Sequence, residues 1–205
     1  MLNGSTLWAW QPVAVTTELS VPKVIHQFWK EAPLSGSPHL DAIATIASCK
    51  AANGDEWVVN TYTSDTIPIH PRLARLHQRA LHDEEALELV RALSLLQMIG
   101  GVFLSELVQC TNKSASIVLG SDANKGVLLL SELSDTSRMT KGFVLASAPQ
   151  RIEIDTLITK ASRPPRKPSK DLVSDSHRLK ETLLGLIKKR SAPFTNINSI
   201  FRLAV

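Results

Sequence analysis

The chain has 205 residues, of which 43% are hydrophobic and 20% are charged. This is the composition of an ordinary globular protein, and it excludes a disordered or fibrous chain. Residues 1–150 hold 11 basic and 14 acidic residues, whereas residues 151–205 hold 12 and 5, so the positive charge lies in the C-terminal part. Cys49 and Cys110 are too few for a disulfide-framework miniprotein and are expected to be buried thiols.

The sequence shows no sign of a membrane anchor or a leader. No run of about 18 apolar residues occurs, so no transmembrane segment is expected. The first 20 residues combine neither a basic start nor an apolar stretch, which argues against a signal peptide and favours a soluble chain. Two triplets, at Asn3 and Asn112, fit the N-glycosylation pattern. Without a secretory signal, they are interpreted as chance occurrences.

The first half of the chain alternates between predicted strands and helices. Residues 21–29 and 57–62 are rich in β-branched and aromatic side chains, which favours strands. Between them, residues 39–52 have apolar side chains at helical spacing, and Asn53-Gly54 is a helix-stop signal.

The most strongly patterned helix is expected at about 83–98, with three acidic residues in its first turn and Gly100-Gly101 after its end. Apolar runs then predict strands at 102–104, 127–130 and 143–146. This order predicts an α/β fold with a mainly parallel sheet. Ligands of such sheets bind at the carboxyl ends of the strands, here just after Ile25, Tyr62 and Leu104.

We expect four parts along the chain: a lead-in (1–20), an α/β domain (21–160), a basic Pro-rich linker or loop (161–175), and a C-terminal helix with an incomplete terminal segment (176–205). The sequence RPPRKPSK within the linker is typical of a hydrated connection, because proline prevents regular structure. No aromatic residues are interleaved with these charges, so no nucleic-acid partner is expected.

Three segments carry a resemblance to a known family. VPKVIHQFWKEAP (Val21 to Pro33) resembles the opening strand of the glycosyltransferases with a DXD-containing sugar-binding region, which include the Och-type mannosyltransferases. Residues 57–65 resemble the family's strand with a W-t-D turn, and residues 88–110 resemble its helix, Gly-Gly turn and metal-binding strand. Weaker matches at 142–149 and 191–195 follow in the same order.

The resemblance implies a GT-A-like nucleotide-diphospho-sugar transferase fold, with a mainly parallel sheet flanked by helices. It also implies transfer of a hexosyl group from a UDP- or GDP-linked sugar to a glycan or glycolipid acceptor. In the family a divalent cation, Mn or Mg, binds the diphosphate through paired carboxylates, and an arginine adds phosphate contacts. Members often work in the Golgi or elsewhere in the secretory pathway, and the localisation of this chain stays open.

By resemblance, eight residues bind the nucleotide sugar: Ile25, His26, Trp29, Asp65, Glu88, Arg91, Gly100 and Gly101. Trp29 would stack on the base, with Ile25 and His26 lining the nucleotide pocket. The alternatives are a core aromatic side chain for Trp29 and a structural role for His26. No residue is assigned a catalytic role.

The metal-binding segment departs from the family pattern. Ser105 and Leu107 stand where the two aspartates of the DXD motif belong, which leaves Glu106 as the one candidate metal ligand. Strand alternation would turn Glu106 to the opposite face. The divalent-cation site is therefore expected to be lost.

Two further departures concern spacing. Arg91 precedes Gly100 by nine positions instead of eight, which rotates the Glu88–Arg91 pair by about 100° around the helix unless a bulge absorbs the extra residue. A plain surface salt bridge is the alternative for this pair. The chain also ends ten residues after the last matching segment, so it is expected to be short relative to the family.

Three hypotheses remain. The first is a glycosyltransferase that uses its nucleotide sugar without the usual metal pair. The second is a catalytically inactive pseudoenzyme that binds a nucleotide or glycan, favoured because the diphosphate has no evident counter-ion beyond Arg91. The third is a basic-tailed nucleic-acid-binding module, whose affinity would fall steeply with salt. A hydrolase triad of Ser105, His26 and Asp65 is disfavoured, because no G-x-S-x-G elbow surrounds Ser105.

Overall fold

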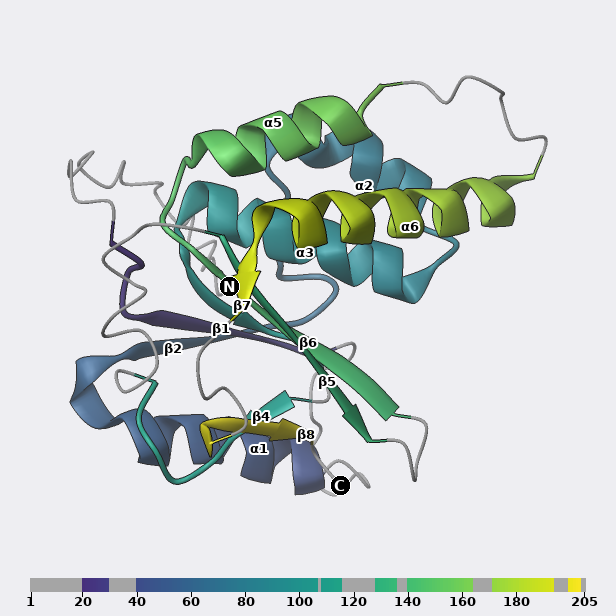
Figure 1. Cartoon of the computed structure of the whole chain (residues 1–205). Helices are drawn as coiled ribbons and strands as arrows, with labels where there is room; N and C mark the ends of the chain where they lie inside the picture. Colours follow the sequence, from purple (N-terminus) through teal and green to yellow (C-terminus); the bar gives the residue numbers. More distant parts are fainter. Residues whose placement is uncertain are drawn as a thin grey trace, which may run out of the picture.

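A mixed β-sheet separates two unequal layers in the computed structural model of the chain (Figure 1). The structure describes residues 20–29, 40–106, 108–115, 128–135, 140–163, 171–193 and 199–203. Residues 1–19 of the expected lead-in, Leu107 and residues 164–170 of the basic Pro-rich segment lie outside the described residues.

The main sheet has six strands in the order β2-β1-β3-β6-β5-β7. Their bounds are β1 (Val24–Phe28), β2 (Val58–Tyr62), β3 (Gly101–Leu104), β5 (Leu129–Asp135), β6 (Thr140–Ser147) and β7 (Ala192–Pro193). β1 pairs in parallel with β2 and β3, and β5 pairs in parallel with β7. β6 is antiparallel to both β3 and β5, so the expected α/β architecture is present with a mixed sheet.

Local sequence signals explain where the helices of the first half begin and end. Helix α1 (Leu40–Asn53) is followed by a 3₁₀ turn at Gly54–Glu56. Helix α3 (Glu84–Met98) begins at an N-cap, because the Asp83 carboxylate accepts a hydrogen bond from the Ala86 backbone N–H at 3.0 Å. Between them lie a 3₁₀ turn at Pro71–Leu73 and the short helix α2 (Ala74–Ala80).

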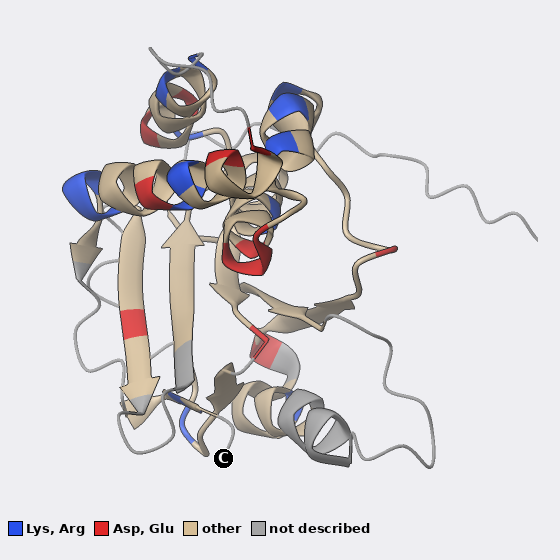
Figure 2. Ribbon diagram, turned by 90° about the vertical axis from the view of Figure 1, so that its right-hand side faces the viewer, with Lys and Arg blue, Asp and Glu red and all other residues tan. Residues whose placement is uncertain are grey.

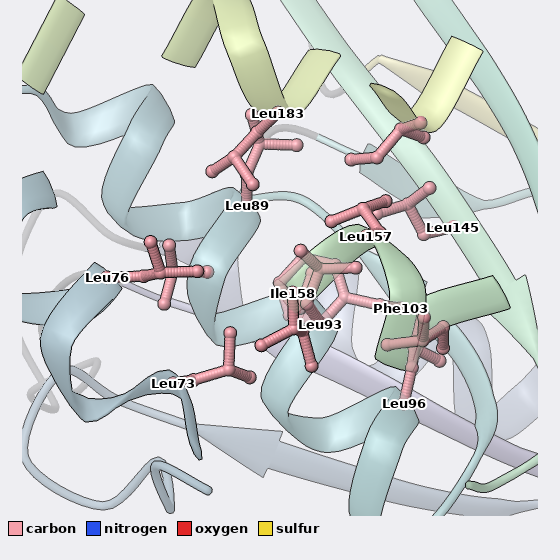
Figure 3. Close-up of a cluster of buried hydrophobic side chains, with 14 of the residues drawn as sticks. Leu73, Leu76, Leu89, Leu93, Leu96, Phe103, Leu145, Leu157, Ile158 and Leu183 are labelled. Carbon is pink, nitrogen blue, oxygen red and sulfur yellow. The ribbon is translucent and has the colours of Figure 1, made fainter. Parts of the chain in front are cut away.

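Helices α2, α3, α5 (Ile152–Ala161) and α6 (Leu172–Arg190) cover one face of the sheet (Figure 1). A leucine-rich core joins them to the strands (Figure 3). Helix α6 begins four residues before the expected boundary at 176, and its Leu179, Leu183 and Ile187 are fully buried in this core. The C-terminal helix is therefore an integral part of the helical layer.

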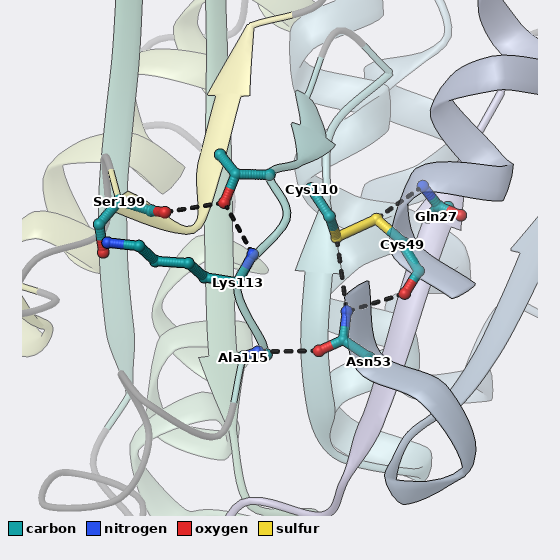
Figure 4. The surroundings of a disulfide bond; sticks show 8 residues. Gln27, Cys49, Asn53, Cys110, Lys113, Ala115 and Ser199 are labelled. Atoms are coloured by element: carbon teal, nitrogen blue, oxygen red, sulfur yellow. Dashed lines mark hydrogen bonds between the residues drawn. A yellow bond between two sulfur atoms is a disulfide. The ribbon is translucent and has the colours of Figure 1, made fainter. Parts of the chain in front are cut away.

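Helix α1 and a two-stranded sheet of β4 (Val108–Cys110) and β8 (Phe201–Leu203) lie on the opposite face (Figure 1). Cys49 on α1 and Cys110 on β4 form a disulfide bond across this layer (Figure 4). The expectation of two free thiols is therefore wrong. A separation of 61 residues gives no sign that the two elements meet, yet the Cα atoms lie 4.9 Å apart.

The charge of helix α6 is mixed along its length, and its last turn is basic (Figure 2). Lys180 forms ion pairs with Asp83 at 3.6 Å and Glu85 at 3.4 Å, and Lys188 pairs with Glu132 on β5 at 2.9 Å. Part of the positive charge of the C-terminal region is therefore neutralised within the fold. Of the described helices, none combines the length and the apolar character needed to cross a membrane.

Candidate functional site

The carboxyl ends of β1 and β3 lie at a point where the connections of the sheet diverge. From β1 the chain passes through α1 to β2 on one side, and from β3 it continues to β5 and β6 on the other side. In open α/β sheets, ligands bind at such a switch point, outside the carboxyl ends of the strands. Residues just after β1, β2 and β3 are therefore the first place to look for a site.

Arg91 on α3 lies at this edge, against the last residue of β1. The carbon of its guanidinium is 4.9 Å from the centroid of the Phe28 ring, a cation–π contact. Arg91 is only 8% exposed, and its Nε is buried without a hydrogen-bond partner among the described residues. A surface salt bridge is therefore not the arrangement found, and Nε is an unsatisfied donor among the described residues.

Phe28 was not among the residues expected at the site. Strand alternation could have indicated it, because Phe28 is two residues after His26 and so shares its face of β1. The extra residue between Arg91 and Gly100 does not turn Arg91 towards solvent.

Three carboxylates interact electrostatically with the Arg91 guanidinium. Burial lowers the pKa of Arg91, while the negative charges of Glu88, Asp65 and Glu84 act in the opposite direction. Asp65 is exposed in the turn after β2, and the other two lie on the first half of α3. The site therefore combines one buried cation with several hydrogen-bond acceptors.

Glu88 links α3 to the segment after β3. Its Oε1 accepts a hydrogen bond from the Glu106 backbone N–H at 2.9 Å. The pKa of Glu88 is raised from its ordinary value of 4.5 to about 7, chiefly by burial and also by the charges of Glu106 and Glu85, against the hydrogen bond from the Glu106 N–H and the charge of Arg91. Carboxyl groups that titrate near neutral pH are enriched at functional sites.

Ser105 and Glu106, which stand at the DXD position, follow the end of β3 and are not part of a strand. β3 ends at Leu104, so strand alternation does not determine where Glu106 points, and that expectation is wrong in its premise. The Ser105 hydroxyl accepts a hydrogen bond from the Phe143 N–H at 2.9 Å, which joins it to β6. Leu107 lies outside the described residues.

The described residues do not fit the divalent cation that the resemblance implies. Within the described part of the chain, no three His, Cys, Asp or Glu side chains are grouped to hold a metal ion. The Glu88 carboxylate accepts a hydrogen bond from the Glu106 N–H, and the Ser105 hydroxyl accepts one from Phe143 on β6. Neither side chain therefore replaces a DXD aspartate.

Trp29 follows β1 directly, and its backbone N–H donates to the Tyr62 carbonyl at 2.9 Å. Its ring nitrogen, Nε1, is buried and has no hydrogen-bond partner among the described residues. Trp29 and Arg91 therefore both bring an unused donor to the carboxyl end of β1.

His26 lies in the interior of the sheet and not at this edge. Its Nε2 is 2.7 Å from the Gly100 carbonyl and its Nδ1 is 3.3 Å from the Tyr62 hydroxyl. Because a carbonyl only accepts, Nε2 carries the proton and Nδ1 accepts from Tyr62. Burial lowers the pKa of His26 to about 4, so the ring is neutral at physiological pH. Both ring nitrogens are thus used within the fold.

The Gly100-Gly101 turn lies at the amino end of β3, opposite the candidate site. Gly101 has a φ of +107°, and a Cβ there would lie 2.4 Å from the Val24 carbonyl oxygen. Gly100 has a φ of +73°, and its Cβ would lie 2.7 Å from the Pro149 nitrogen. The glycines therefore permit close packing of α3, β1 and β6.

The eight expected binding residues fall into two groups. Trp29, Asp65, Glu88 and Arg91 lie around the carboxyl ends of the parallel strands, together with Glu106. Ile25, His26, Gly100 and Gly101 are packed in the interior, where Ile25 belongs to the core beneath the sheet.

No model of a known protein family matches this chain, and no curated protein sequence matches it either. The interpretation of the site therefore rests on the chemistry of its residues and on the motif resemblance.

Proposed function

We propose that this chain is a glycosyltransferase-like protein that binds a nucleotide sugar at the carboxyl ends of β1, β2 and β3. The observation that carries the proposal is the buried Arg91 guanidinium at the switch point of the sheet, stacked on Phe28, with no hydrogen-bond partner for its Nε in the described part of the chain. A fixed guanidinium with unused donors suits a phosphate oxygen or a sugar hydroxyl.

The neighbouring side chains suit the sugar part of such a ligand. The carboxylates of Glu88 and Asp65 are acceptors for hydroxyl groups, and Arg91 is a donor beside them. Trp29, at the same strand end, supplies an aromatic ring and an Nε1–H that has no partner among the residues described. The reaction implied by the resemblance is transfer of a hexosyl group from a UDP- or GDP-linked sugar to a glycan or glycolipid.

The second candidate is a catalytically inactive protein that retains nucleotide or glycan binding. The departing diphosphate needs positive charge, and Arg91 shares its surroundings with the carboxylates of Glu88, Asp65 and Glu84. The backbone hydrogen bonds to Ser105 and Glu88 favour this candidate, because they occupy side chains near the DXD position. We therefore expect this chain to bind a nucleotide or glycan more readily than it catalyses hexosyl transfer.

The test is a thermal-unfolding panel with UDP, GDP and their common hexose conjugates, each with and without manganese. A ligand at about 100 times its Kd should raise the Tm by about 5 °C or more. Arg91→Met should abolish the shift, because the donor is lost. The matched control is Arg79→Met, which removes an arginine paired with Asp175 at 2.9 Å within the helical layer and should keep the shift.

Each result has a clear meaning. A shift that requires manganese supports the enzyme and leads to a hexosyl-transfer assay. A shift without manganese dependence supports the binding protein. If the chain melts cooperatively but no ligand changes its Tm, the proposal is rejected.

A further inference from the structure

The triplet Asn112-Lys113-Ser114 lies on a bend directly after β4. Asn112 and Lys113 are both exposed. The pattern Asn-x-Ser, with x other than proline, is the acceptor for N-linked glycans in secreted proteins. The only other such triplet in the sequence begins at Asn3, outside the described residues.

The bend is held at both of its ends. Before it, the Thr111 backbone N–H donates to the Ile200 carbonyl at 2.6 Å, and the Thr111 hydroxyl donates to the Ser199 carbonyl at 2.7 Å. After it, the Ala115 N–H donates to the Asn53 side-chain oxygen at 2.8 Å (Figure 4). These anchors fix the bend to β8 and α1 while leaving Asn112 at the surface.

The neighbouring disulfide is a second, independent observation. Cys110 precedes Asn112 by two residues and is bonded to Cys49 beneath the sheet. Asn53 joins this disulfide to the bend, because its side-chain nitrogen donates to the Cys49 carbonyl at 2.8 Å (Figure 4). Disulfides form and persist in oxidising compartments such as the lumen of the endoplasmic reticulum, which is also where N-glycosylation takes place. The interpretation of the triplet as a chance occurrence therefore loses its basis.

We propose that Asn112 is a site of N-linked glycosylation, acquired in the compartment where the Cys49–Cys110 disulfide forms. The donor is an oligosaccharide carried on a lipid diphosphate. The bond from the sugar's anomeric carbon to the diphosphate oxygen breaks, and a bond from that carbon to Asn112 Nδ2 forms. Nδ2 loses one proton and the lipid diphosphate leaves, so no oxidant or reductant is needed.

The position of the bend predicts that the glycan leaves the candidate site open. The bend is anchored to α1 and β8 on one face of the sheet, whereas Arg91 belongs to α3 on the other face. Glycosylation of Asn112 is thus independent of the proposed function. It would hold whether or not the chain binds a nucleotide sugar.

The test is to express the full chain behind a secretory leader in eukaryotic cells and to analyse both the secreted and the retained protein. Peptide-N-glycosidase should convert Asn112 to Asp in the wild-type protein, as read by peptide mass spectrometry. Asn3→Gln should keep a glycan that this enzyme removes, and adding Asn112→Gln should abolish it. Ser114→Thr keeps the acceptor pattern and should stay glycosylated, whereas Ser114→Ala should not.

Thiol alkylation without reductant reports in the same samples whether Cys49 and Cys110 are bonded. A glycan on Asn112 in the oxidised protein supports the proposal. An unmodified Asn112 in a chain whose disulfide has formed overturns it, and so does a chain that reaches the secretory compartment with both thiols free. The wild-type peptide decides the question even if a substituted chain fails to fold.

Discussion

Two groups of buried polar residues lie at opposite ends of β3, and they differ in how fully their hydrogen bonds are used. At the amino end, His26 is bonded through both ring nitrogens, to Gly100 and to Tyr62. At the carboxyl end, Arg91 Nε and Trp29 Nε1 are buried without a partner among the described residues. We call these the satisfied group (His26, Gly100, Gly101) and the unsatisfied group (Trp29, Arg91).

The difference distinguishes buried polar groups whose hydrogen bonds are made within the fold from buried polar groups that have no partner in its described part. A buried polar group with all its partners helps to specify the fold, whereas a buried group left unpaired lowers stability. Under the proposed function, the donors of Arg91 Nε and Trp29 Nε1, which have no partner among the described residues, are the ones that a ligand would engage. Sequence motifs alone placed both groups in one nucleotide site, because they do not show which hydrogen bonds are already used.

The largest expected effect is on the satisfied group, from Gly101→Ala. A Cβ there would lie 2.4 Å from the Val24 carbonyl oxygen, at a φ of +107°. Since neither backbone segment can move without disturbing β1 or β3, we expect a loss on the order of 3 kcal/mol or more in the free energy of unfolding. Urea unfolding at pH 7 measures it.

The control is Gly54→Ala, at a φ of +54° with no atom within 4 Å of the added Cβ. Only the conformational cost applies there, so we expect a loss of about 1 kcal/mol. Equal losses of unfolding free energy for Gly101→Ala and Gly54→Ala would show that the close approach of Gly101 to Val24 does not restrict this position to glycine.

The next effect is the pH dependence of stability that His26 causes. Its pKa is about 4 in the folded chain and 6.5 in the unfolded chain. Between these values the unfolded chain binds more protons, so stability is complete above pH 6.5 and is lost as the pH falls towards 4. The contribution is on the order of 3 kcal/mol. Urea unfolding from pH 8 to pH 4 measures this slope, and His26→Gln should remove it. An unchanged slope in that variant would contradict the assignment.

Much of the fold could be predicted from local signals. Helix α3 starts at the Asp83 cap and ends before the Gly-Gly turn, as composition and spacing indicate. The direction of β6 was not predictable, because hydrophobic alternation is the same in parallel and antiparallel strands. The packing of α6 against the core depends on contacts with residues about 100 positions earlier, which no local pattern contains.

The site was predictable in part for the same reason. The sequence indicated that the residues after β1, β2 and β3 meet, which follows from strand order. It did not indicate that Phe28 supports Arg91, or that Cys49 bonds to Cys110, because these contacts depend on the rotation of α3 and the position of α1.

A smaller effect, of opposite sign, is expected from Glu88→Gln, next to the unsatisfied group. Glu88 has a pKa of about 7 in the folded chain against 4.5 as its ordinary value. Its contribution to stability is therefore complete below pH 4.5 and is lost as the pH rises through 7. Glutamine keeps an acceptor for the Glu106 N–H and carries no charge, so we expect a gain of about 1–2 kcal/mol at pH 8 and none at pH 4. Urea unfolding at the two pH values measures the difference, and a loss at pH 8 would mean that the Glu88 charge stabilises the fold.

The smallest effect on stability is expected from Arg91→Met, although it should have the largest effect on ligand binding. Methionine keeps most of the side-chain volume over Phe28, and it removes a buried charge whose Nε has no described partner. Replacement of such a charge by an apolar side chain is often neutral or stabilising, so we expect a change within about 1 kcal/mol in the free energy of unfolding.

Arg79→Met, the control, should lower the free energy of unfolding more, because it leaves Asp175 without the cation that holds it at 2.9 Å and 3.1 Å. Urea unfolding of both variants, with nucleotide-sugar binding measured alongside, makes the comparison. If Arg91→Met unfolds the chain, then Arg91 belongs to the structural group, and the site loses the residue on which its function was proposed.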